Sequence, residues 1–292
     1  AMELLEHNET LEEARARNVR DALREDLGTG DWTAMLVPQE RMAVAQVVCR
    51  DAAVLCGQAW FDACVQALDP HAQLRWVCAE GADTSPGDVV VEIRARARAL
   101  LSAERSALNF LQLLSATATR TRAHVQAIAG ASSNPRGCAV LDTRKTVPGL
   151  RLAQKYAVRV GGGANQRLAL WHGILIKENH IAAAGGVGAA LRAAHALDAA
   201  VDIQIEVETL TQLDEALAAG ARSILLDNFS LEATREAVAR NAGRALLETS
   251  GGVSLEQLRD IAATGVDRIS LGTLTKDVRA VDFSMRVTET GG

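Results

Sequence analysis

The fold is decided by residues 202–227, which read DIQIEVETLTQLDEALAAGARSILLD. Two short runs rich in isoleucine, leucine and valine, Asp202–Val207 and Ser223–Leu226, flank Leu210–Ala219, which has the composition of a helix. A strand, a helix and a second strand in succession indicate two parallel strands joined by a crossover helix. Residues 202–227 therefore predict one βαβ unit.

The same alternation extends through the second half of the chain. Stretches of helical composition, such as Leu231–Arg240 and Leu255–Ala263, separate most of the strand-like runs. About seven units in this order fit a closed or nearly closed α/β barrel better than a small open sheet. The predicted strands are Ala139–Leu141, Ala157–Val160, Gly173–Ile176, Asp202–Val207, Ser223–Leu226, Arg244–Leu247 and Arg268–Leu271.

The first half of the chain has another pattern, typical of a mixed α+β unit. The predicted helices are Leu11–Leu27, stopped by Gly28 and Gly30, then Gly57–Leu68 and a long one from Ser102 to about Ile128. The predicted strands are Met42–Arg50, Gln73–Ala79 and Val89–Ala97, the last two joined by a turn over Ser85–Asp88.

The composition excludes several classes of protein. The 292 residues are 48% hydrophobic and 23% charged with a net charge of −5, which is typical of a soluble globular protein and argues against a general nucleic-acid coat. No run of about 18 uncharged apolar residues occurs, and the acidic start, residues 2–7, lacks the apolar core of a signal peptide. Five cysteines without a CxxC pair are expected to be reduced thiols, as in a cytoplasmic protein.

Polar residues or glycines follow the apolar run in almost every predicted unit. A parallel barrel gathers the carboxyl ends of its strands on one face, where barrel enzymes build their sites. Any one of these residues alone has a structural explanation, such as a solvated lysine or a helix cap, but together they favour a site. They are Asp142-Thr143-Arg144-Lys145, Gly161-Gly162-Gly163, Lys177-Glu178-Asn179-His180, Glu206 with Glu208, Asp227-Asn228, Glu248 with Ser250-Gly251-Gly252, and Gly272-Thr273.

The charges among these residues indicate a polyanionic substrate. Arginine binds planar carboxylates through two hydrogen bonds, while lysine supplies a compact charge. Carboxylates opposite the cations suit sugar hydroxyls, or a divalent metal bound through phosphate oxygens. The cations are Arg144, Lys145, Arg167 and Lys177, and the carboxylates are Glu206 and Asp227.

Two glycine-containing segments after the last predicted strands are candidate phosphate sites. In Ser250-Gly251-Gly252 and in Leu271-Gly272-Thr273, glycine would let backbone N–H groups approach a phosphate, and a following helix N-terminus would complete the site. An ordinary tight turn explains these glycines equally well outside a barrel.

A set of motifs, in order along almost the whole chain, resembles the quinolinate phosphoribosyltransferase family. They are Glu25-Asp26-Leu27-Gly28, Gly30-Asp31-Trp32-Thr33, Glu104–Phe110, Asp142–Arg151, Lys155–Val158, Gly161–Arg167, Leu175–His180, Glu206-Val207-Glu208, Leu226-Asp227-Asn228 and Glu248–Gly252.

The resemblance implies an N-terminal open-faced α/β sandwich followed by an incomplete (open) α/β barrel. We expect residues 1–118 to form the sandwich, with 279–292 packing back on it, and residues 119–278 to form the barrel. The family joins quinolinate to phosphoribosyl pyrophosphate with Mg²⁺, giving nicotinate mononucleotide, pyrophosphate and CO₂ in de novo NAD biosynthesis. A cytoplasmic homodimer or higher oligomer is implied, with no nucleic-acid or membrane partner.

The resemblance also implies roles for particular residues. Lys177, Glu206 and Asp227 are the expected catalytic residues, and the two carboxylates would also bind Mg²⁺, directly or through phosphate oxygens. Arg105 is expected to reach the site of a partner subunit. The implied substrate-binding residues are Arg105, Thr143, Arg144, Lys145, Gln166, Arg167, Lys177, Glu206, Asp227, Ser250, Gly251, Gly252 and Gly272.

One position departs from the family pattern. Members usually carry Asn-His-Arg where this chain has Asn165-Gln166-Arg167. Glutamine keeps a hydrogen-bond donor but cannot carry a positive charge, so either acceptor binding is weaker or the acceptor is less anionic. The neighbouring histidines, His172 and His180, are expected to be structural rather than catalytic.

Three alternatives remain open from the sequence. A ModD-like paralogue, associated with molybdate transport genes, would use another anionic acceptor. A Schiff-base aldolase would use Lys177 as its nucleophile. A non-catalytic dimeric scaffold would not bind phosphoribosyl pyrophosphate.

Overall fold

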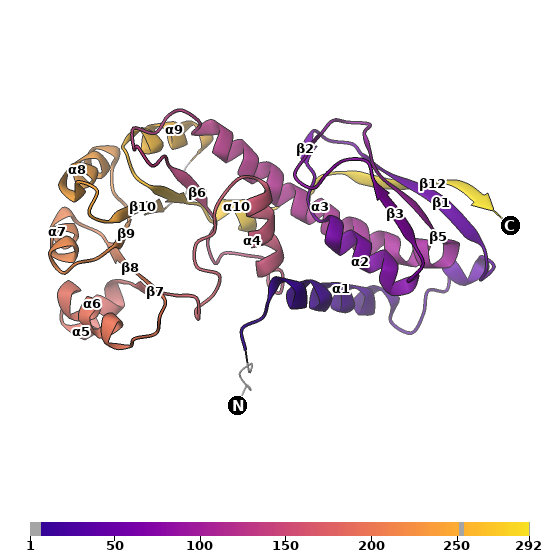
Figure 1. Cartoon of the computed structure of the whole chain (residues 1–292), viewed down its shortest axis with the longest axis horizontal. Helices are drawn as coiled ribbons and strands as arrows, with labels where there is room; N and C mark the ends of the chain where they lie inside the picture. Colours follow the sequence, from indigo (N-terminus) through magenta and orange to yellow (C-terminus); the bar gives the residue numbers. More distant parts are fainter. Residues whose placement is uncertain (1–6, 251–253, 292) are drawn as a thin grey trace. The chain divides into compact units, whose positions relative to one another are not determined.

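The computed structural model describes residues 7–250 and 254–291, and the chain divides into two compact units (Figure 1). The first consists of Ala1–Arg120, Val147–Gly161 and Val278–Gly292, and the second of Thr121–Thr146 and Gly162–Asp277. Among the described residues, no helix is long and apolar enough to cross a membrane.

The first unit contains an antiparallel sheet and helices that pack on it. The sheet has the strand order β12 (Phe283–Gly291), β1 (Met42–Cys49), β5 (Val89–Arg96), β3 (Gln73–Trp76), and β2 (Ala53–Val54) pairs separately with β4 (Asp83–Thr84). The helices are α1 (Leu11–Leu27), α2 (Gln58–Leu68), α4 (Arg151–Val160) and α3 (Ala97–Ala127) up to Arg120, with a short 3₁₀ turn at Ala34–Leu36.

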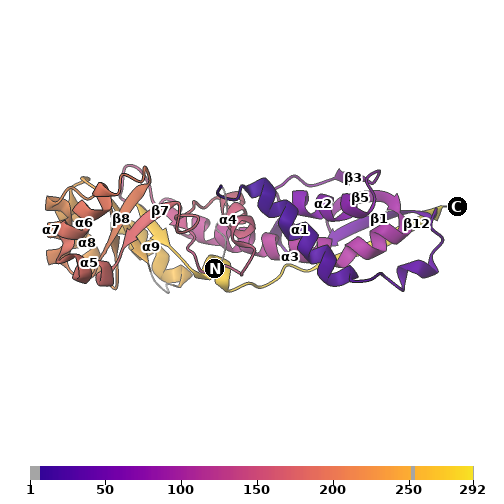
Figure 2. The same ribbon diagram turned by 90° about the horizontal axis from the view of Figure 1, so that it is seen from below.

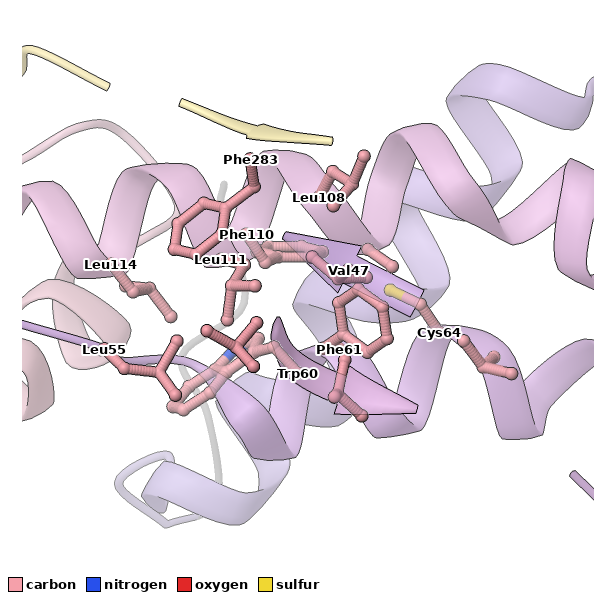
Figure 3. Close-up of a cluster of buried hydrophobic side chains, with 14 of the residues drawn as sticks. Val47, Leu55, Trp60, Phe61, Cys64, Leu108, Phe110, Leu111, Leu114 and Phe283 are labelled. Atoms are coloured by element: carbon pink, nitrogen blue, oxygen red, sulfur yellow. The ribbon is translucent and has the colours of Figure 1, made fainter. Parts of the chain in front are cut away.

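Alternating burial along β1 explains how this sheet forms a core. Every second residue of β1 is buried, because successive side chains of a strand point to opposite faces. Val47 from β1 packs in one hydrophobic cluster with Phe61 of α2 and Leu111 of α3 (Figure 3). Phe283 of β12 belongs to the same cluster, so the C-terminal strand is part of this unit.

The second unit contains a six-stranded parallel sheet covered by helices, which confirms the predicted α/β fold. The strand order is β6 (Ala139–Leu141), β11 (Arg268–Ser270), β10 (Leu246–Ser250), β9 (Ser223–Leu226), β8 (Asp202–Val207), β7 (Gly173–Ile176). The helices are α5 (Glu178–Ala184), α6 (Val187–Ala196), α7 (Leu210–Ala218), α8 (Leu231–Asn241), α9 (Leu255–Ala263) and α10 (Thr273–Lys276). Helices α6, α7 and α8 line one side of the sheet (Figures 1 and 2), and the sheet is open between β6 and β7.

One predicted strand is wrong. Ala157–Val160 is the end of α4, in which Ala153, Gln154, Ala157 and Val158 are buried at the three- and four-residue spacing of a helix. A four-residue apolar run does not distinguish a strand from a buried helix. The sheet therefore has six strands rather than about seven.

Helix α4 also explains why residues 147–161 belong to the first unit rather than to the predicted barrel range 119–278. The Tyr156 hydroxyl donates to Glu80 Oε2 at 2.8 Å. The Tyr156 ring packs against Trp60 with ring centroids 5.3 Å apart. These contacts lie within the first unit, and Ala153 and Ala157 join its hydrophobic cluster.

Two element boundaries differ from the prediction in ways that matter for the site. Strand β10 starts at Leu246, not Arg244, because the Asn241 side chain bonds both the N–H and the C=O of Ala245 and holds the preceding turn. Helix α3 starts at Ala97, five residues before Ser102. Arg105 therefore lies about two turns into the helix and not in its first turn.

Candidate active site

Three charged residues follow one another across the carboxyl ends of neighbouring strands. Lys177 comes directly after β7, Glu206 lies near the end of β8, and Asp227 comes directly after β9. Because Ile176 pairs with Ile205 and Leu226 with Val207 in the parallel sheet, the three reach the same edge. The structure therefore brings together the residues that the sequence suggested as catalytic.

The pKa of the Glu206 carboxyl reports the electrostatics of this edge. Burial raises that pKa most, the charge of Asp227 raises it further, and the charge of Lys177 lowers it. A carboxylate whose ionisation is opposed by burial and by a neighbouring negative charge favours a positively charged ligand beside it. The arrangement suits a metal ion or a sugar that develops positive charge.

The raised pKa leads to a prediction about stability. Because folding raises the pKa of Glu206, the folded protein holds this proton more tightly than the unfolded chain, and stability is lost as the pH rises past the ordinary value of 4.5. Glu206→Gln cannot ionise, so its melting temperature should rise relative to the parent between pH 4 and pH 7. Glu215→Gln on the exposed face of α7 is the control. A difference that is constant across this pH range would contradict the prediction.

Lys145 is held by backbone and side-chain contacts at the end of β6. Its N–H donates to Thr143 Oγ1 at 3.1 Å, and its C=O accepts from the Thr275 hydroxyl at 2.7 Å. A Cβ on Gly272 would lie only 2.8 Å from Lys145 Cδ. Besides letting a phosphate approach the backbone, as the sequence predicts, glycine at position 272 leaves room for Lys145, since a side chain there would displace the lysine. The helix after it, α10, has four residues.

A buried aspartate, Asp142, holds part of the segment between β6 and β7 in place through hydrogen bonds. Asp142 is fully buried and accepts from the Gln166 N–H at 2.9 Å and from Asn165 Nδ2 at 2.5 Å. Ala164 forms a parallel bridge with Leu141 of β6. The segment therefore lies along the open edge of the sheet. Asp142 was visible in the motif after β6, but its contact partners were not.

Two guanidinium groups lie near each other in this part of the second unit. Burial lowers the pKa of Arg167, and the charge of Arg144 lowers it further. Arg167 Nη1 also donates to the C=O of Gly173 at 3.0 Å. An anion that binds beside two like charges offsets their repulsion. Arg167 contacts the first residue of β7, whereas Lys177 follows the last, so these two cations lie at opposite ends of that strand.

The remaining predicted residues are placed as follows. Ser250 is the last residue of β10, and Gly251 and Gly252 lie outside the described residues. Arg105 is exposed on α3 in the first unit, where it lines a cavity of about 410 Å³. His180 Nδ1 accepts from the Lys177 N–H at 3.0 Å, and His172 Nδ1 accepts from the Leu168 N–H at 3.2 Å. Both histidines thus have the structural contacts expected of them.

One inward-facing polar residue, Gln204, was missed, and Glu248, which was predicted to follow a strand, lies inside β10. Gln204 of β8 and Glu248 of β10 are 7% and 1% exposed, and they bond to each other across the sheet at 2.9 Å. The signal for Gln204 was present, because Asp202, Gln204 and Glu206 alternate with Ile203, Ile205 and Val207. Such alternation places polar side chains on the inner face of the sheet.

Comparison with known proteins was consistent in both sequence and structure. Family models match the quinolinate phosphoribosyl transferase N-terminal domain over residues 31–115 and the C-terminal domain over residues 117–286. The nicotinate-nucleotide pyrophosphorylase (carboxylating) of Mycobacterium leprae is 41% identical over 283 residues, 94% of this chain and 97% of that protein. The human protein of the same name is 37% identical over 269 residues, 91% of this chain and 89% of that protein. The solved nicotinate-nucleotide pyrophosphorylase of Francisella tularensis has a TM-score of 0.88 at 39% identity and covers 96% of this chain and 98% of its own.

Proposed function

The chain belongs to the quinolinate phosphoribosyltransferase family, and we propose that its strand-end site transfers the phosphoribosyl group of phosphoribosyl pyrophosphate to quinolinate. The products are nicotinate mononucleotide, pyrophosphate and CO₂, and the reaction is a step of de novo NAD biosynthesis. Relatives at 37–41% identity carry the name of this carboxylating enzyme, which favours this acceptor over that of a ModD-like paralogue.

The observation that carries the proposal is the electrostatic interaction of Arg144 with Arg167, whose pKa is lowered by burial and by this interaction. Each guanidinium can bind a carboxylate through two parallel hydrogen bonds, and quinolinate has two carboxylates. The depressed pKa of Arg167 reflects burial and repulsion by Arg144, and a bound dianion relieves that repulsion. Lys145, whose backbone C=O accepts from Thr275 and whose side chain passes close to Gly272, supplies a further charge after β6.

The carboxylates at the ends of β8 and β9 suit the sugar. When pyrophosphate leaves, positive charge develops on the ribose, and Glu206 with Asp227 would stabilise it electrostatically. Lys177 beside them binds anionic groups near the reacting carbon. Holding the ring nitrogen and the sugar against each other is a problem of orientation, which fixed charges solve.

The same two carboxylates would hold Mg²⁺ with help from the substrate. Among the described residues, no three His, Cys, Asp or Glu side chains are placed to bind a metal by themselves. Mg²⁺ commonly keeps several waters and uses one or two carboxylates plus substrate phosphates, so Glu206 and Asp227 fit that role. The ion would neutralise charge on the departing pyrophosphate. Ser250, Gly251, Gly252 and Gly272 would bind the 5′-phosphate.

We also propose a cytoplasmic homodimer in which Arg105 completes the partner subunit's site. The five cysteines, Cys49, Cys56, Cys64, Cys78 and Cys138, form no disulfide. Burial raises the pKa of Cys64 and of Cys138 to about 12, which keeps these thiols protonated and unreactive. Reduced thiols support a cytoplasmic protein. Arg105 lies in the first unit and the other cations in the second, as a shared site allows.

The acceptor is tested by comparing two ligands that differ by one carboxylate. Calorimetric titration should show quinolinate binding at least about tenfold more tightly than nicotinate, since one charged hydrogen bond contributes about 1.5–3 kcal/mol. Tighter binding of nicotinate would point to a monocarboxylate enzyme, and no binding of phosphoribosyl pyrophosphate would point to a scaffold. Borohydride trapping on Lys177 with a carbonyl substrate would point to an aldolase.

Gln166→His should tighten quinolinate binding. An imidazolium adds positive charge beside a carboxylate, so the gain should be larger at pH 6 than at pH 8, with little change for phosphoribosyl pyrophosphate. Titrations of parent and variant at both pH values measure it. An unchanged or weaker affinity, together with turnover of a monocarboxylate by the parent, would indicate a substrate-switched paralogue.

A further inference from the structure

A chain of hydrogen bonds crosses the inside of the parallel sheet. Gln166 Nε2 donates to Gln204 Oε1 at 2.7 Å. Gln204 Nε2 donates in turn to Glu248 Oε2 at 2.9 Å and to the Ser223 hydroxyl at 3.2 Å. These hydrogen bonds connect the segment at the open edge of the sheet with β8 and β10, both inside the sheet.

The hydrogen bonds of this chain all run in one direction. A carboxamide has a donor end and an acceptor end, whereas a carboxylate oxygen accepts. Because Glu248 accepts, Gln204 turns its NH₂ toward Glu248 and its carbonyl toward Gln166. Gln166 then turns its NH₂ toward Gln204. The carbonyl oxygen of its side chain accepts from the backbone N–H of Arg167 at 2.6 Å. One carboxylate thus sets the direction of two amides.

Glu248 is expected to lower the stability of the fold at this position. Its side chain is 1% exposed, and its second oxygen, Oε1, has no hydrogen-bond partner among the described residues. A buried polar atom without a partner destabilises a fold, and a buried hydrogen-bonded pair can often be replaced by two apolar residues of the same shape at little cost. A requirement other than packing explains a glutamate here.

We propose that Gln204 and Glu248 are positioning residues that fix the carboxamide of Gln166 for binding of the acceptor. The inference rests on the proposed function. Gln166 precedes Arg167, and the buried Asp142 holds its backbone. With its carbonyl turned to the Arg167 N–H, Gln166 keeps that oxygen away from a dicarboxylate held by Arg167. A reversed amide would lose its hydrogen bonds with Gln204 and with the Arg167 N–H, so the two partners fix one orientation of the Gln166 carboxamide beside Arg167.

The kinetic test uses Gln204→Met, which keeps the length of the side chain and removes its hydrogen bonds. The KM for quinolinate should rise about threefold to tenfold, the scale of one neutral hydrogen bond, while kcat and the KM for phosphoribosyl pyrophosphate change less than twofold. Glu248→Gln, which can present either end of its amide, should raise the same KM without lowering the melting temperature. Gln58→Met, which removes one hydrogen bond in the first unit, is the matched control.

A double-mutant cycle separates positioning from a structural role. If Gln204 acts through Gln166, Gln204→Met has no further effect on the quinolinate KM in a Gln166→Ala background. Additive effects of the two changes, or equal increases in both KM values, would overturn the proposal.

A measurement without substrate distinguishes this proposal from the proposed function. In protein labelled with ¹⁵N-glutamine, the Gln166 side-chain signal is the one missing from Gln166→Ala. Its hydrogen exchange should be slow in the parent and much faster in Gln204→Met and in Glu248→Gln. Fast exchange already in the parent would overturn the positioning role. Slow exchange in a parent that does not turn over quinolinate would support the positioning role and overturn the proposed function.

Discussion

Replacing Arg144 or Arg167 by alanine is expected to weaken quinolinate binding by about 1.5–3 kcal/mol, roughly 10- to 150-fold. Each guanidinium is expected to bind a carboxylate, and a bound dianion would offset the repulsion between the two. Binding of phosphoribosyl pyrophosphate should change much less, because Ser250, Gly272, Glu206 and Asp227 lie on other strand ends.

Calorimetric titration of both ligands tests this expectation. Arg235→Ala, on the exposed side of α8, is the matched control for loss of one positive charge. Arg144→Lys keeps the charge but loses the planar pair of donors, so its affinity should fall between parent and alanine variant. Because Arg167 also donates to the C=O of Gly173, the melting temperature of Arg167→Ala is measured alongside. Equal losses for the two ligands would mean that the pocket is wrongly assigned.

Mixing two inactive variants should restore activity. Arg105→Ala removes the cation that each subunit is proposed to supply to its partner, and Lys177→Ala removes a cation of the subunit's own site. In a mixed dimer, one site combines an intact Lys177 with an intact Arg105, and the other lacks both. After complete exchange of an equimolar mixture, about a quarter of the sites should be active if pairing is random.

A helix beginning at Ser102, as the sequence predicted, would place Arg105 in its first turn, where the helix dipole disfavours a cation. Arg105 is not near the N-terminus of its helix, because α3 starts at Ala97, so repulsion by the helix dipole does not single it out. What supports the shared site is that Arg105 is exposed beside a cavity in the first unit, together with the family resemblance. Native mass spectrometry of differently tagged variants would show whether subunits exchange. Exchange without any return of activity would contradict the shared site.

Much of the second unit was predictable, because its strands are short apolar runs and its helices are amphipathic. The run Asp202–Val207 and the helix after it have the predicted bounds within one residue. Ala157–Val160 was misread, since four apolar residues fit the end of a buried helix as well as a strand. The start of β10 was misplaced because the Asn241 side chain extends the preceding turn.

The candidate site was predictable where it depends on topology alone. Lys177, Glu206 and Asp227 each follow or end a strand, so a parallel sheet must bring them to one edge. Contacts that depend on register or on close packing were not predictable. Predicting the hydrogen bond between Gln204 and Glu248 requires the register of β8, β9 and β10. The closeness of Gly272 to Lys145 requires the conformation of two loops.

The most direct test of the central claim is turnover of quinolinate labelled with ¹³C in its 2-carboxyl group. Incubated with the protein, phosphoribosyl pyrophosphate and Mg²⁺, it should give nicotinate mononucleotide, pyrophosphate and labelled CO₂ in equal amounts. Parallel reactions with nicotinate and with nicotinamide should give no nucleotide. Nucleotide formed from nicotinate, with the labelled quinolinate left unchanged, would contradict the account.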